Sequence, residues 1–90
     1  MEFEYDPNKS ASNTIKHGID FEEAQELWQD ADRLEIPAHF RGEERFAVIG
    51  RIPERMWTAV YTMRGNTIRL ISCRRSRNDE VALYEYEKRK

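Results

Sequence analysis

Apolar and polar residues alternate along much of the chain, with the period of two that is typical of half-buried β-strands. The clearest case is residues 56–63, where Trp57, Ala59 and Tyr61 share one face and threonines and a valine share the other. Gly65-Asn66 then separates this segment from the next apolar run, which is the spacing of a tight hairpin. We expect strands at residues 2–5, 33–36, 45–51, 56–63 and 67–73.

Helical signals frame these strands. Asp6-Pro7 is a typical helix start and Gly18 a typical stop, which predicts a first helix ending at His17, with Ala11 and Ile15 on its apolar face. Asp20 begins a second helix that should end near Asp30. Its apolar stripe is formed by Phe21, Ala24, Leu27 and Trp28. A third helix is expected at about residues 77–88, docked through Val81 and Tyr84.

The expected order is therefore β-α-α-β-β-β-β-α in a single domain, residues 1–90. Strands two to five are joined by short connections, including a polar loop at 38–43 and a turn at Pro53-Glu54, which favours an antiparallel sheet. The two early helices should pack on one face of it. These patterns predict an α+β fold with two layers.

Composition narrows the class of protein. Charged residues make up 36% of the chain, no apolar run is long enough to span a membrane, and the N-terminus lacks the pattern of a signal peptide. The single cysteine, Cys73, lies in an apolar strand, so we expect a buried, inert thiol. One cysteine with His17 and His39 is too few for a dedicated zinc site. A soluble, cytoplasmic protein without metal or cofactor fits these observations.

Charge is distributed unevenly. Residues 1–35 contain ten acids and three bases, whereas residues 36–90 contain seven acids and twelve bases. Such a division suggests a basic working face and an acidic face elsewhere, although the two halves could also simply neutralise each other across the fold.

The most basic segment is a strand end. Three arginines fall within four residues at Arg74, Arg75 and Arg77, next to the start of the third helix. Guanidinium groups and helix N-termini both bind phosphate, which predicts contact with a nucleic acid. Since side chains alternate along a strand, Arg74 and Arg75 should point to opposite faces unless a bulge intervenes.

No hydrolase or metalloprotease motif is present. Catalysis by Arg, Lys, His and Glu alone is sufficient for one reaction, in which the 2′-hydroxyl of RNA attacks the adjacent phosphate. The protein then needs only to orient the phosphate, stabilise its extra charge and move protons.

Four blocks resemble the BrnT family of bacterial toxins in order and spacing. They are Phe3-x-Tyr5-Asp6-Pro7-x-Lys9, Asn13-x-x-Lys16-His17-Gly18-Ile19-x-Phe21-x-Glu23-Ala24, Gly42-Glu43-Glu44-Arg45-Phe46-x-x-Ile49-Gly50 and Ile68-Arg69-Leu70-Ile71-Ser72-Cys73-Arg74-Arg75. The resemblance implies a RelE-like ribonuclease fold and a growth-arresting toxin that cleaves RNA. It also implies a BrnA-like antitoxin partner, which would be the only route to promoter DNA.

Candidate site residues follow from the basic segments and from this resemblance. As catalytic residues we expect Arg64, Arg74, Arg75, His17 and Glu44, and as RNA-binding residues Lys16, Arg45, Arg69 and Arg77. Several have simpler explanations, since Lys16 and His17 suit a helix C-terminus and Glu44 with Arg45 could form a surface ion pair. Aromatic residues such as Trp57 and Tyr61 could stack bases but are more typical of a core.

Two other functions remain open. The chain could be a non-enzymatic binding module that docks a partner protein through its charged faces. Direct DNA binding is the weaker hypothesis, because the chain is net acidic and has no recognition helix.

Overall fold

The computed structural model describes residues 1–38 and 42–90. His39 and part of the expected polar loop 38–43 therefore lie outside the described residues. The elements are β1 (Glu2–Glu4), α1 (Pro7–His17), α2 (Phe21–Ala24), the 3₁₀ helix η1 (Gln25–Gln29), β2 (Leu34–Ala38), β3 (Arg45–Ile52), β4 (Arg55–Arg64), β5 (Thr67–Arg75) and α3 (Asn78–Lys88).

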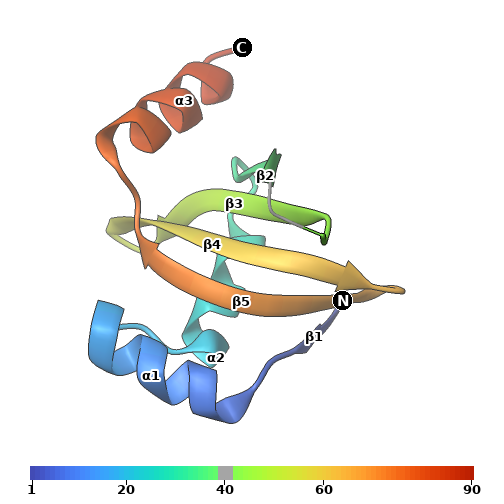
Figure 1. The fold of residues 1–90 in the computed structure, drawn as a ribbon. Coiled ribbons are helices and arrows are strands. Elements are labelled where there is room, and N and C mark those ends of the chain that lie inside the picture. The colour runs from blue at the N-terminus through green and yellow to red at the C-terminus, as the bar shows by residue number, and fades with distance from the viewer. Residues whose placement is uncertain (39–41) are drawn as a thin grey trace.

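The strands form one sheet in the order β1-β5-β4-β3-β2 (Figure 1). Strands β2 to β5 are antiparallel neighbours, as expected from the short connections. The expectation of a purely antiparallel sheet is wrong at one edge, because β1 pairs with β5 in parallel, with Phe3 opposite Ile68. The sheet is therefore mixed.

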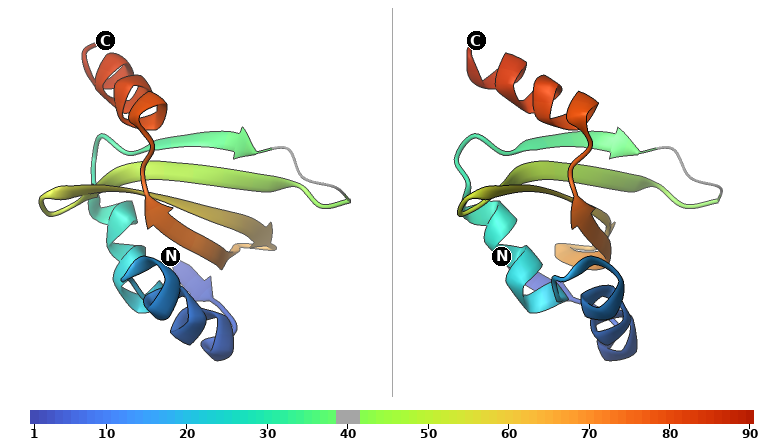
Figure 2. Two further views of the ribbon diagram at one scale, coloured as in Figure 1. Left: turned by 60° about the vertical axis from the view of Figure 1, so that its left-hand side comes forward. Right: turned by 90° about the vertical axis from the view of Figure 1, so that its left-hand side faces the viewer.

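The sheet carries helices on both faces (Figure 2). The early helices cover one face, as expected, and there the apolar stripe of Phe21, Ala24, Leu27 and Trp28 joins the main core. However, α3 packs on the other face through Tyr84 and Val81, in a second cluster with Ile49 and Met56. The two-layer expectation is therefore incomplete.

The second helix is shorter and tighter than expected. It is α-helical only to Ala24 and continues as the 3₁₀ helix η1. Leu27 follows Ala24 by three residues, which matches the three residues per turn of a 3₁₀ helix. Phe21 and Ala24 of α2 and Leu27 of η1 are all buried on the sheet.

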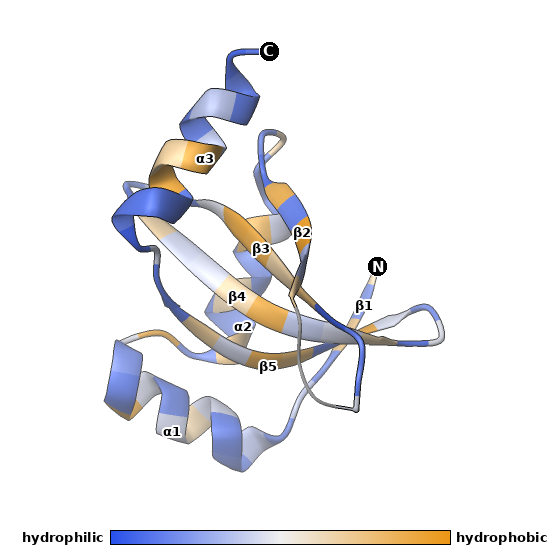
Figure 3. Cartoon of the chain, turned by 45° about the horizontal axis from the view of Figure 1, so that its top comes forward, coloured by the Kyte–Doolittle hydropathy of each residue, from blue (hydrophilic) through white to orange (hydrophobic). Residues whose placement is uncertain are grey.

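Helix α1 contacts the fold through polar side chains, and Figure 3 shows it as mostly hydrophilic. The expected apolar face is wrong, because Ala11 is exposed and Ile15 is 89% exposed. Ser10 and Asn13 are buried instead. The side-chain amide of Asn13 donates to the carbonyls of Ile19 and Cys73, both at 2.8 Å, and its oxygen accepts from the Cys73 N–H at 3.2 Å.

A β-bulge changes which side chains share a face. Val60 pairs with Ser72 but Tyr61 pairs with Leu70, so Ile71 is an extra residue in β5. Arg69 and Arg74 therefore lie opposite Thr62 and Thr58, on the face that also carries α3. Without the bulge, an odd separation of five residues would place the two arginines on opposite faces.

Candidate functional site

A polar hollow of about 180 Å³ lies where β3 begins, β4 ends and β5 begins. Its lining is mainly cationic and comes from five parts of the chain. The lining residues are Lys9, Glu43, Arg45, Thr62, Arg64, Arg69 and Ile71. In Figure 3 the start of β3 is hydrophilic, whereas the middle of β3 is hydrophobic.

Strand register brings the arginines of this hollow together. Thr62 of β4 lies opposite Arg69 of β5. Because Phe46 pairs with Tyr61, Arg45 of β3 lies next to Thr62 across the other edge of β4, on the same face of the sheet. The Thr62 hydroxyl donates to the Glu44 carbonyl at 2.7 Å, which holds the start of β3 against β4. Three neighbouring strands thus present their side chains to one point.

Two of the four cations have carboxylate partners. Arg69 Nη1 lies 2.6 Å from Glu4 Oε2, and Arg45 Nε lies 3.3 Å from Glu43 Oε2. In the described part of the chain, no carboxylate lies within ion-pair distance of Lys9 or Arg64. The four cations exceed these two carboxylates by two charges. The hollow is therefore suited to an anion that carries up to two negative charges.

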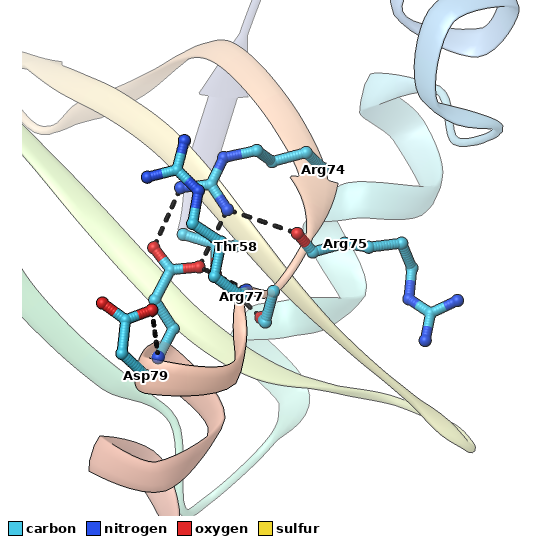
Figure 4. A network of polar contacts seen from close by, with 7 residues as sticks. Thr58, Arg74, Arg75, Arg77 and Asp79 are labelled. Atoms are coloured by element: carbon cyan, nitrogen blue, oxygen red, sulfur yellow. Dashed lines mark hydrogen bonds and ion pairs between the residues drawn. The ribbon is translucent and has the colours of Figure 1, made fainter.

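Arg74 does not line the hollow. It lies at the end of β5, beside the start of α3 (Figure 4). Its guanidinium binds both oxygens of Glu80 at 2.8 and 2.9 Å. Glu80 also accepts from the Arg77 backbone N–H at 2.8 Å and from the Thr58 hydroxyl at 3.1 Å. These bonds join β4, β5 and α3, and the one from Arg74 does most to lower the pKa of Glu80, to about 2.

This network predicts an acid-sensitive attachment of α3. The pKa of Glu80 lies below its ordinary value of 4.5, so its stabilisation is complete above that value and is lost as the pH falls towards 2. We expect the stability of the wild type to fall more steeply over this pH range than that of a Glu80→Gln variant. Urea unfolding at a series of pH values measures the difference. Equal slopes in the two proteins would contradict the expected role of Glu80.

The other basic residues of the sequence prediction do not join the hollow. Arg75 lies on the opposite face of the sheet, with its guanidinium carbon 5.6 Å from the centre of the Trp57 ring. This confirms that Arg74 and Arg75 point to opposite faces. Arg77 is exposed at the N-cap of α3. Of the three arginines expected to be catalytic, only Arg64 lines the hollow.

Helix α1 reaches the hollow with its first turn rather than its last. Lys9 lines the hollow, but Lys16 and His17 belong to the last turn, about 10 Å further along the helix. Gly18, with φ of 80°, ends the helix there as expected. Neither Lys16 nor His17 is among the lining residues.

From the sequence we expected Glu44 in the site, but its neighbour Glu43 lines the hollow, together with Lys9, which was not expected there. The Glu44 side chain is exposed and does not line the hollow, whereas Glu43 does. Lys9 and Glu43 both belong to blocks that resemble the BrnT family, so the signal was present in the sequence. Neither residue type nor spacing distinguished them from their neighbours.

Metal ligands do not gather in the residues that the structure describes, since no group of three His, Cys, Asp or Glu side chains could hold an ion there. Cys73 is fully buried, and burial raises the pKa of its thiol to about 12, in agreement with the expected inert thiol. No helix in the described ranges is long and apolar enough to cross a membrane.

Comparison with known proteins adds the family. A search of curated proteins gave no match. The family model described as "Ribonuclease toxin, BrnT, of type II toxin-antitoxin system" matches residues 5–80. That range includes all seven residues that line the hollow. The chain therefore belongs to the BrnT family of ribonuclease toxins, whose members act in type II toxin-antitoxin systems.

Proposed function

We propose that this protein is a metal-independent endoribonuclease and that the cationic hollow is its active site. The observation that carries the proposal is the convergence of Lys9, Arg45, Arg64 and Arg69 in one small polar hollow with an excess of two positive charges. The same hollow contains a carboxylate, Glu43, that could accept a proton. A phosphate group fits both the size and the charge of this arrangement.

The proposed reaction uses the substrate's own nucleophile. Glu43 accepts the proton of the 2′-hydroxyl as that oxygen attacks the neighbouring phosphorus. The phosphorus then carries five oxygens and two negative charges, which the guanidinium groups of Arg45, Arg64 and Arg69 stabilise. The bond to the 5′ oxygen breaks, and this oxygen takes a proton from Lys9 or from water. The products are a 2′,3′-cyclic phosphate and a 5′-hydroxyl.

The wider biological role follows from the family. The order of helices and strands around a mixed sheet supports a RelE-like ribonuclease fold. Membership of a type II toxin family implies an antitoxin partner, for which we propose a BrnA-like protein. Promoter DNA would be reached only through that antitoxin.

The reaction predicts cleavage of RNA in excess EDTA, because no step uses a metal ion. Purified protein should cut an RNA oligonucleotide and leave cyclic phosphate and 5′-hydroxyl ends, which mass spectrometry identifies. An oligonucleotide of the same sequence with 2′-O-methyl groups should stay intact, because its nucleophile is blocked. Loss of activity in EDTA, or cleavage of the methylated control, would overturn the mechanism.

A further inference from the structure

A second recessed surface lies at the other end of the sheet. Two hollows of about 280 and 270 Å³ adjoin there, and both are lined by Ile52 and Pro53. One is also lined by Glu26, Gln29, Asp30 and Arg51, and the other by Glu23, Glu54, Arg55 and Trp57. Together they form a groove between the α2–η1 segment and the turn that joins β3 to β4. We call it the acidic groove.

The floor of the acidic groove is apolar and its walls are charged. Ile52 and Trp57 are 7% and 8% exposed, so only an edge of each forms the floor, and Pro53 is exposed beside them. Asp30 has internal partners, because it accepts hydrogen bonds from the Arg51 N–H at 2.9 Å and the Tyr84 hydroxyl at 2.8 Å. The Arg51 guanidinium is paired with Glu85 at 3.6 Å.

The remaining charges are mostly negative. Glu23, Glu26 and Glu54 are exposed, and in the described ranges none of them forms an ion pair. Arg55 is the one base of the groove that likewise has no ion-pair partner there. An apolar floor between unpaired carboxylates fits a ligand that is both apolar and cationic.

The acidic groove is well separated from the cationic hollow. Arg55 begins β4 and Arg64 ends it, so the ten residues of this extended strand place the two sites about 30 Å apart. RNA is repelled by the carboxylates of the groove, which argues against an extension of the nuclease site. A protein segment is the occupant that combines apolar contacts with positive charge.

We propose that the acidic groove is the docking site for an apolar, lysine- or arginine-rich segment of the antitoxin. The proposal rests on the toxin's membership of a type II system and not on the cleavage mechanism. On this proposal the toxin binds its antitoxin in the acidic groove and cleaves RNA in the cationic hollow. A segment seated in the groove anchors the antitoxin without itself contacting Arg64.

Charge reversal in the groove tests the proposal. The cognate antitoxin, produced from the reading frame beside the toxin gene, is titrated against wild-type toxin and a Glu23→Lys/Glu26→Lys variant. We expect affinity to fall by about tenfold or more, because two attractive contacts become repulsive. A Glu2→Lys/Glu87→Lys variant makes the same change in net charge elsewhere and should bind within about twofold of wild type.

Two further measurements separate the possible failures. RNA cleavage by the groove variant alone should equal that of wild type, whereas Arg64→Ala should lose cleavage and keep antitoxin affinity. Wild-type affinity for the groove variant, or loss of affinity in Arg64→Ala only, would overturn the docking proposal. Absence of cleavage by wild-type protein would overturn the enzymatic mechanism and leave the binding result to be judged on its own. Circular dichroism melts confirm that each variant is folded.

Discussion

Replacing Arg64 by alanine should reduce the rate of RNA cleavage by about 10²–10³-fold, the usual cost of removing one donor that stabilises transition-state charge. Arg64 lines the cationic hollow, and no carboxylate in the described residues is paired with it. Its charge is therefore available to the phosphate. Initial rates on a fluorogenic RNA, measured in EDTA, give the effect directly.

Arg75→Ala is the matched control for this substitution. It removes the same side chain from the same sheet, but from the face that lies against Trp57. We expect its cleavage rate to stay within a fewfold of wild type. Similar losses in both variants would point to a general electrostatic effect on RNA binding. Full activity in Arg64→Ala would exclude the hollow as the active site.

The largest effect on stability is expected at Asn13. Its amide forms three hydrogen bonds with backbone groups of Ile19 and Cys73. Asn13→Ala leaves all three groups buried without a partner, and each such group costs about 1–3 kcal/mol. We therefore expect the free energy of unfolding to fall by about 3 kcal/mol or more, measured from the midpoint of urea unfolding.

Ile15→Ala provides the comparison on the same helix. Ile15 is 89% exposed, so its truncation should change stability by less than about 0.5 kcal/mol. Had the apolar face predicted from the sequence been correct, the order of the two effects would be reversed. Equal or reversed effects of the two substitutions would show that the Asn13 bridge does not hold α1 to the sheet.

Local patterns predicted most helices and strands because the signals are themselves local. Asp6 with Gly18 and the alternation of residues 56–63 each depend on neighbours in the chain. The parallel pairing of β1 with β5 could not be predicted in this way. Only three residues of β1 take part, and their partners lie about 65 residues away. Likewise, the sequence of α1 does not predict that the side chain of Asn13 binds the backbone of Ile19 and Cys73.

The sequence pointed to part of the lining of the cationic hollow. Arg45, Arg64 and Arg69 were expected to take part, and the structure brings them together because strand register does so. Arg74, Arg75 and Arg77 are close in sequence, yet strand alternation puts Arg75 on the other face, and Arg74 and Arg77 both bind Glu80 and do not line the hollow. The bulge at Ile71 also changes the face of every residue beyond it, and no sequence signal marks its position.

The pairing of β1 with β5 has a consequence for synthesis of the toxin. Glu4 precedes its ion-pair partner Arg69 by 65 residues, so the ribosome makes it long before the strand that holds Arg69. The cationic hollow cannot assemble on the ribosome until β5 has emerged. On the proposed mechanism, a nascent chain that lacks β5 therefore cannot cleave RNA. Prematurely terminated fragments that lack β5 would be equally inert.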